Sequence, residues 1–153
     1  MQDQRTTTLT TVLSEVLANL AFMFTDDGEV GSPVGERWLE TSISYGGFMS
    51  GTLRLTCAAT FATQLAANLL GVESSEKITE QESNDAVKEF MNVVCGQYVT
   101  TAYGTEDVFN LTIPEVLERS TTPRFGDPQA APEDVALLSV EGQWIQLLHT
   151  RSP

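Results

Sequence analysis

Four residues in the middle of the chain have types and spacing that could do chemistry: Asp85, Glu89, Asn92 and Gly96. Spacings of four, three and four residues place them on one side of a helix at about 100° per residue. A carboxylate can hold a cationic side chain of a partner, and an amide can orient a water molecule without being a strong base. Phosphoryl transfer depends on such alignment. We call these four residues the polar stripe and treat them as a candidate working surface.

The same segment carries a separate apolar face, which predicts that the polar stripe points outward. The apolar residues recur at helical spacing about half a turn away: Val87, Phe90, Met91, Val94 and Tyr98. Helix stability does not explain Asn92 or Gly96, because Gly within a helix is about 1 kcal/mol worse than Ala. Gly96 would let another protein approach the helix backbone closely, and Lys88 borders the stripe as a further candidate contact. The alternative is an ordinary solvated face, since Glu-x-x-Asn also occurs by chance.

Other kinds of catalytic or metal site lack the residues they need. His149 is the only histidine and falls in a predicted strand, so no Ser-His-Asp triad or two-histidine metal site can form. Cys57 and Cys95 lack the spacing of metal ligands and are expected to be small buried thiols in a reduced compartment. The glycines form no phosphate-binding motif. Enzyme chemistry is therefore narrowed to carboxylates and amides.

Composition predicts one globular domain spanning residues 1–153. The 153 residues are 41% hydrophobic and 19% charged, and a chain of this length buries about two thirds of its unfolded surface. The net charge of −13 and the pI near 4.2 argue against binding to nucleic acid or anionic membranes. No apolar run approaches the roughly 18 residues of a membrane span, and the first residues are polar. We expect a soluble cytoplasmic protein.

The pattern of helices and strands predicts an α+β fold, with long helices packed on a mainly antiparallel β-sheet. The helix that carries the polar stripe is expected to begin at a capping box formed by Thr79 and Glu82 and to end at Gly104. Gly71 is expected to end the helix before it. Two Gly- and Pro-rich loops are expected at 26–35 and 120–134. Helices are expected at 8–24, 58–70 and 79–104, and strands at 39–45, 49–57, 109–113, 135–140 and 143–149.

The stripe also resembles the signature of a known family. The segment reads Asp85-Ala-Val-Lys-Glu89-Phe-Met-Asn92-Val-Val-Cys-Gly96. It is similar to the CheC/CheX family of chemotaxis phosphatases, in which an acidic or serine residue precedes Glu-x-x-Asn on a long helix and Gly follows one turn later. Family members tend to carry a proline some twenty residues after the Asn, and Pro114 stands 22 positions after Asn92. The chain resembles the family in element order and length as well.

This resemblance implies a CheC/CheX-like fold and the hydrolysis of the aspartyl phosphate on a phosphorylated CheY-like response regulator. Glu89 would pair with a lysine of the regulator, and Asn92 would enter its acidic pocket and place the attacking water. Mg²⁺ would belong to the regulator, so no cofactor is expected on this chain. Asp85, Lys88 and Gly96 would contact the partner.

A second copy of the motif, which some family members carry on the first helix, is incomplete in this chain. Glu15 and Asn19 are four residues apart, and Ala18 stands where the Asn should be. The resemblance therefore implies one active face, as in CheX, and that branch of the family implies a homodimer.

The alternative class is a non-catalytic acidic interaction module. A small acidic α+β protein also suits a secretion chaperone that holds an extended client segment, or an adaptor derived from the phosphatase family. The polar stripe discriminates the two classes, because a chaperone tolerates the loss of Asn92 or Gly96 and a phosphatase does not.

Overall fold

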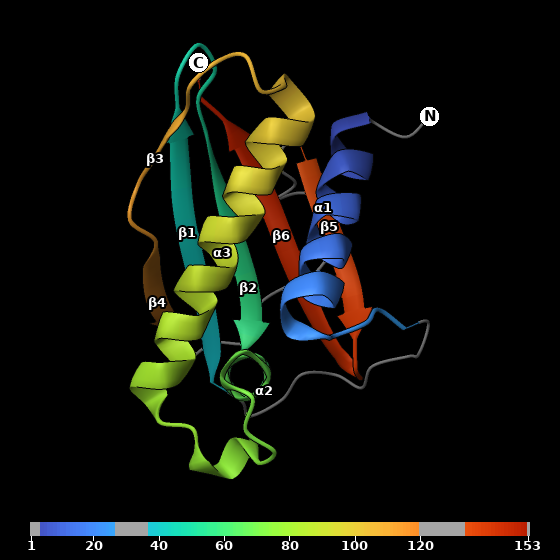
Figure 1. Cartoon of the computed structure of the whole chain (residues 1–153), viewed down its shortest axis with the longest axis vertical. Helices are drawn as coiled ribbons and strands as arrows, with labels where there is room; N and C mark the ends of the chain where they lie inside the picture. Colours follow the sequence, from blue (N-terminus) through green and yellow to red (C-terminus); the bar gives the residue numbers. More distant parts are fainter. Residues whose placement is uncertain (1–3, 27–36, 120–133, 153) are drawn as a thin grey trace.

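The computed structural model describes residues 4–26, 37–119 and 134–152. Within these residues, three helices and six strands follow one another, with one short 3₁₀ turn before the longest helix (Figure 1). In chain order these elements are α1 (Gln4–Ala21), β1 (Trp38–Gly46), β2 (Gly51–Ala58), α2 (Ala59–Leu70), η1 (Ser75–Lys77), α3 (Glu80–Tyr103), β3 (Asn110–Leu111), β4 (Glu115–Arg119), β5 (Asp134–Val140) and β6 (Gln143–Arg151).

The strands form one antiparallel sheet in the order β3-β1-β2-β6-β5, and β4 also pairs with β1. In Figure 1, α1 and α3 lie on the same face of this sheet, with α3 against β1 and α1 against β5. Helices segregated to one face of an antiparallel sheet are the α+β arrangement. The predicted fold class is therefore confirmed.

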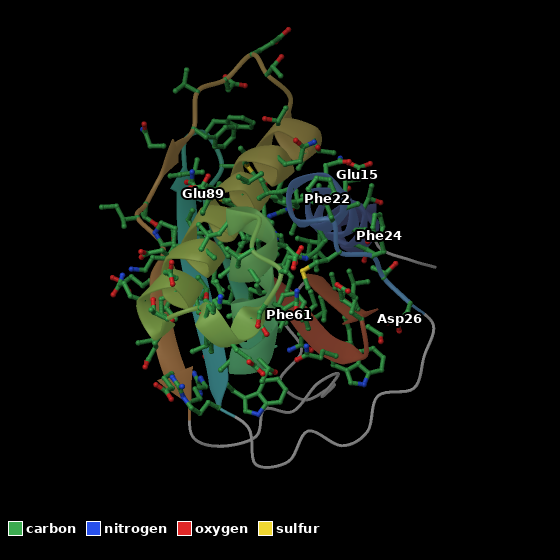
Figure 2. All side chains as sticks on the ribbon, turned by 60° about the horizontal axis from the view of Figure 1, so that its bottom comes forward. Glu15, Phe22, Phe24, Asp26, Phe61 and Glu89 are labelled. Atoms are coloured by element: carbon green, nitrogen blue, oxygen red, sulfur yellow. The ribbon has the colours of Figure 1, made fainter. Side chains whose placement is uncertain are left out.

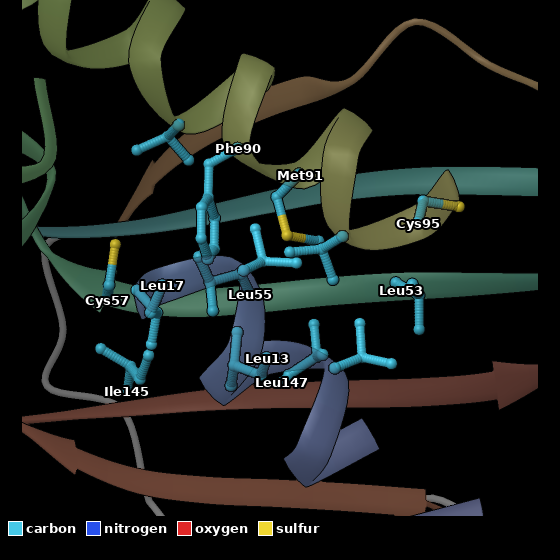
Figure 3. Close-up of a cluster of buried hydrophobic side chains, with 14 of the residues drawn as sticks. Leu13, Leu17, Leu53, Leu55, Cys57, Phe90, Met91, Cys95, Ile145 and Leu147 are labelled. Atoms are coloured by element: carbon cyan, nitrogen blue, oxygen red, sulfur yellow. The ribbon is translucent and has the colours of Figure 1, made fainter. Parts of the chain in front are cut away.

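The core lies between the helices and the sheet, and α3 contributes much of it. Figure 3 shows Phe90 and Met91 projecting from α3 among the aliphatic side chains of α1, β2 and β6. Both side chains have no exposed surface. The predicted apolar face of α3 is confirmed, because all five of its residues are buried: Val87, Phe90, Met91, Val94 and Tyr98.

The predicted alternation in the first hairpin is confirmed. Alternate residues of β1 are buried against the helices: Leu39, Thr41, Ile43 and Tyr45. The hairpin pairs Ile43 with Leu53, so two buried residues face the core side by side. β2 begins at Gly51, two residues later than the sequence predicts. Met49 lies before the strand and is partly buried.

The ends of α3 and α2 agree with their sequence signals. The Thr79 Oγ1 accepts a hydrogen bond from the Glu82 N–H at 3.1 Å, and the Thr79 N–H donates to Glu82 Oε1 at 2.9 Å. This is the predicted capping box. Gly104 follows the last residue of α3, and Gly71 ends α2 in the left-handed conformation with φ 72°.

The prediction for the first helix is wrong at both ends, since α1 spans Gln4–Ala21 and not 8–24. Phe22 adopts φ 55°, and the Met23 N–H donates to the Leu17 carbonyl at 3.0 Å. The left-handed residue and this hydrogen bond together cap the end of the helix, although the bond spans six residues and not the five of a Schellman motif. The cap forms on a phenylalanine, a residue that gives no stop signal, because Met23 is buried in the core while Phe22 points outward.

The prediction of one strand over 109–113 is also wrong. β3 is only Asn110–Leu111, and a further strand, β4, runs from Glu115 to Arg119. Both pair with the same edge of β1, and Pro114 lies between them. Proline lacks the N–H needed for continuous pairing, so one strand is divided into two. The sequence did not predict β4 because the strand lacks an alternation of apolar and polar residues. Val116 is its one partly buried residue, and the other four are exposed.

The closing hairpin is confirmed, with β5 and β6 joined at Glu141 and Gly142, whose φ angles are 48° and 82°. Two successive positive φ angles are typical of a tight hairpin turn. Asp26 contributes to this end of the sheet by accepting hydrogen bonds from Ser139 Oγ at 2.7 Å and the Gly142 N–H at 3.0 Å. Most of the two predicted long loops, 26–35 and 120–134, lies outside the described residues, which leave out 27–36 and 120–133.

Candidate functional site

The polar stripe lies on the outer side of α3, as the sequence predicts. Asp85, Glu89 and Asn92 are exposed, and Gly96 is partly exposed. A Cβ on Gly96 would meet no described atom within 4 Å beyond its chain neighbours and the backbone of its own helix, so the space beside it is open. Figure 2 labels Glu89 on α3, and Figure 3 shows the neighbouring Phe90 directed into the core. One helix therefore buries one face and presents the other.

Two groups of the stripe have no partner within the described part of the chain. Asp85 Oδ1 accepts a hydrogen bond from Gln81 Nε2 at 2.8 Å, which holds that carboxylate against its own helix. Glu89 and Asn92, by contrast, make no hydrogen bond or ion pair with any described residue, and neither does Lys88. The carboxylate and the amide are thus free to bind groups of another molecule.

A buried aromatic cluster fixes the C-terminal half of α3 to the sheet. Tyr45 Oη lies 2.7 Å from both His149 Nε2 and Tyr103 Oη, and Tyr98 Oη lies 3.3 Å from His149 Nδ1. Burial raises the pKa of the Tyr45 phenol above its usual value and keeps it neutral. His149 has no exposed surface. It is a residue of β6 that helps to hold α3 against the sheet, and it lies apart from the polar stripe in the core.

An ion-pair cluster at the other end of α3 joins the helix to the sheet edge. Arg37 pairs with Glu118 of β4 and, at 3.1 Å, with Glu80, the first residue of α3. The Arg37 guanidinium holds the pKa of the Glu118 carboxyl below its ordinary value, chiefly through their hydrogen bond. All three side chains are largely exposed, so the cluster contributes little stability in water. Its geometry nevertheless anchors β4 beside α3.

The two cysteines are free and buried, as predicted. Burial raises the pKa of the Cys57 and Cys95 thiols to about 12, because an ionised sulfur would lose its solvation in the core. Neither thiol is a nucleophile at neutral pH. The described residues contain no group of three or more His, Cys, Asp or Glu side chains that could hold a metal ion.

The structure places the residues of the incomplete second motif beside α3. Glu15 and Asn19 are exposed on α1, and together with Val93 and Gln97 of α3 they line a groove of about 280 Å³. Sequence reasoning missed Val93 and Gln97. Each follows a stripe residue directly, but which flank of α3 meets α1 depends on how the two helices pack. No signal in the sequence could have identified this groove.

The fold and the polar stripe together define a class: an α+β protein that displays a carboxylate and an amide on its longest helix. The family model of the chemotaxis phosphatase CheX matches residues 41–124, which is more than half of the chain and includes all of α3. The chain therefore belongs to the CheX family of chemotaxis phosphatases.

No curated protein matches the sequence. No helix in the described part of the chain combines the length and apolar character needed to cross a membrane.

Solved structures share this fold at low sequence identity. A chemotaxis protein CheX from Desulfovibrio desulfuricans has a TM-score of 0.70 and 16% identity, covering 98% of this chain and 100% of that chain. A CheC-like protein from Shewanella has a TM-score of 0.67 and 19% identity, covering both chains completely. The CheX–CheY–BeF₃–Mg²⁺ complex from Borrelia burgdorferi has a TM-score of 0.62 and 16% identity, covering 99% of this chain and 100% of that chain. These likenesses concern the fold.

Proposed function

We propose that this chain hydrolyses the aspartyl phosphate of a phosphorylated CheY-like response regulator. The observation that carries the proposal is the pair Glu89 and Asn92, exposed on one side of α3 and without a partner among the described residues. Membership of the CheX family supports the reaction. The complex of CheX with CheY from Borrelia burgdorferi supports the class of partner, because that protein shares the fold of this chain.

Asn92 is the water-orienting residue in this proposal. Its amide can accept a hydrogen bond from a water and donate one to an oxygen of the phosphoryl group, which fixes the line of attack. The water oxygen bonds to phosphorus as the bond from phosphorus to the aspartate oxygen breaks. The products are the free aspartate carboxylate and inorganic phosphate, and the phosphate carries both protons of the water. Alignment supplies most of the rate gain, since the amide is no base.

Glu89 anchors the regulator one turn before Asn92. Residues three apart on a helix have Cβ atoms about 5 to 6 Å apart, so the two side chains can enter one pocket together. The carboxylate binds a lysine ammonium of the regulator by a charge-assisted hydrogen bond. Mg²⁺ belongs to the regulator in this proposal and neutralises phosphoryl charge there. Asp85, Lys88 and Gly96 lie around this pair and contact the partner.

The first experiment measures dephosphorylation of a panel of phosphorylated CheY-like receivers from the same genome by wild type, Asn92→Ala and Glu89→Ala. We expect wild type to accelerate at least one receiver. Asn92→Ala should lower kcat by about 100-fold, because misplacing the attacking group costs that much. Glu89→Ala should mainly raise KM. Both changes favour the helix, since Ala is the better helix former, so loss of folding would not explain the result.

Matched controls remove the same groups from exposed positions outside α3. Asn110→Ala and Glu106→Ala should leave dephosphorylation unchanged, since both residues lie beyond the stripe-bearing helix. If no receiver responds to wild type, or Asn92→Ala is as active as wild type, the phosphatase proposal is wrong. The non-catalytic interaction module would then be the better account, with the stripe as solvated surface.

The homodimer implied by the CheX branch remains a separate expectation. Sedimentation equilibrium of the purified chain over a range of concentrations tests it, because a monomer and a dimer differ twofold in mass. A monomer at all concentrations would remove this expectation and leave the proposed reaction untouched, since Glu89 and Asn92 belong to the same helix of one chain.

A further inference from the structure

The groove between α1 and α3 lies along the flank of α3 next to the polar stripe, and none of the four stripe residues lines it. Val93 and Gln97 form its wall on α3, and they directly follow Asn92 and Gly96 of the stripe. A molecule that covers the stripe and extends toward α1 must therefore also cover the groove. Figure 2 labels Glu15 on α1. The groove is lined by Glu15, Val16, Asn19, Leu20, Val93 and Gln97.

The lining has an apolar floor and a polar rim. Val16, Leu20 and Val93 are buried or partly buried, whereas Glu15, Asn19 and Gln97 are exposed. The Glu15 carboxylate makes no hydrogen bond or ion pair with any described residue. Among the residues that the structure describes, no basic side chain lines the groove. At about 280 Å³ the space is far larger than the ~30 Å³ of one water, so it has room for one long side chain.

We infer that this groove receives a lysine or arginine side chain from the same response regulator that Asn92 acts on. The methylene stem of such a side chain would lie on the apolar floor, and its cationic head would reach the Glu15 carboxylate and the amide oxygens at the rim. An anionic side chain is disfavoured by Glu15 and by the net charge of −13. The inference rests on the proposed function and names the chemistry that selects the partner.

Two carboxylates then hold the regulator at two points. Glu89 binds its first basic group on the outer side of α3, and Glu15 binds a second basic group across the groove. The stripe contacts all lie on α3, so a further contact on α1 restricts the orientation of the regulator more tightly than the stripe alone. A receiver with a basic residue at the second point is a substrate with low KM, and a receiver that lacks it has a high KM. Such rim contacts discriminate partners by charge.

Two variants of the groove test whether it binds a basic side chain of the regulator, by steady-state kinetics on a receiver that wild type dephosphorylates. Glu15→Lys reverses the charge at the rim and should raise KM about tenfold with kcat within twofold of wild type. Asn19→Arg places a guanidinium of this chain four residues after Glu15 on the same helix. The resulting i, i+4 ion pair stabilises α1, and the arginine side chain fills the groove. This variant should raise KM as well. Glu73→Lys, at an exposed loop position, makes the same change in net charge and should leave KM unchanged.

Charge swapping identifies the occupant. Each exposed Lys and Arg of the receiver beside its phosphorylation pocket is changed to Glu, and one of these changes should restore the KM of Glu15→Lys. If wild type is active but Glu15→Lys matches Glu73→Lys, this inference is wrong and the proposed function stands. If wild type dephosphorylates no receiver, both are wrong. If Asn92→Ala alone loses kcat while no receiver variant rescues Glu15→Lys, the groove does not hold a basic side chain.

Discussion

Glu89 and Phe90 are neighbours in α3, but the Glu89 side chain is exposed while the Phe90 side chain has no exposed surface. Successive helix positions differ by about 100° in direction, which suffices to separate solvent from core. Function and stability are therefore expected to be separable at adjacent residues. Phe90→Ala should lower the free energy of unfolding by about 3 to 5 kcal/mol, because it leaves a cavity. Glu89→Ala should change it by no more than about 0.5 kcal/mol.

Urea denaturation of the two variants measures this difference. The transition midpoint should fall strongly for Phe90→Ala and stay near the wild-type value for Glu89→Ala. Equal losses for the two variants would contradict the orientation of α3 on which the whole site depends.

Gly96 is expected to be a residue of function and not of stability. Apart from its chain neighbours and the backbone of its own helix, no described atom lies within 4 Å of a Cβ placed on it, so Gly96→Ala should stabilise the fold by about 1 kcal/mol through helix propensity alone. Gly96→Leu should also fold, but its side chain would stand where the regulator approaches α3, so KM for the phosphorylated receiver should rise. Thermal unfolding and dephosphorylation kinetics measure the two effects. A leucine variant with wild-type KM would show that nothing approaches the backbone here.

Gly51 is the opposite case, because the fold requires it. A Cβ at this position would lie 2.6 Å from Tyr45 Oη and 2.9 Å from His149 Nε2. Both rings are buried and hydrogen-bonded to each other, so neither can move aside freely. Gly51→Ala should therefore cost about 1 to 3 kcal/mol of stability. In a double-mutant cycle with Tyr45→Phe the two losses should be less than additive, since removing the hydroxyl removes the shortest of the close contacts. Strict additivity would argue against this contact.

The buried thiols are expected to be unreactive in the native protein. With the pKa of Cys57 and Cys95 at about 12, roughly one thiol in ten thousand is ionised at pH 8, against about one in four for an ordinary cysteine. A thiol reagent such as dithionitrobenzoate should label both only after unfolding in guanidinium. Fast labelling of the native protein would contradict their burial.

The raised pKa of the two buried thiols also predicts a loss of folding stability at alkaline pH. The folded state favours the neutral thiols, so their contribution is complete below about pH 8.5, the ordinary cysteine pKa. It falls as the pH rises from there toward 12, because the unfolded thiols ionise first. Urea midpoints of the wild type should decrease across this pH range. For each protein the decrease is measured from its own midpoint at pH 7, and it should be smaller for Cys57→Ala than for wild type.

Local signals predicted the parts of the fold that short stretches of chain control. The capping box at Thr79 and the glycine after Tyr103 bound α3 correctly, and alternation predicted the β1–β2 and β5–β6 hairpins. Each of these signals acts through hydrogen bonds or side-chain directions within a few residues. The end of α1 at Phe22 and the strand β4 were missed for a different reason. Burial of Met23 in the core and pairing with β1 decide them, and both involve residues distant in sequence.

The polar stripe itself is a property of the sequence. Once the segment from Glu80 to Tyr103 is helical, the spacing of Glu89 and Asn92 puts them on one side, and the buried residues between them decide that this side faces outward. The groove beside the stripe is a property of the tertiary structure alone. It exists because α1 and α3 pack side by side on one face of the sheet and bring Glu15 opposite Gln97, which lie 82 positions apart in the chain. Helical periodicity determines the face of one helix, but only packing determines what lies across from it.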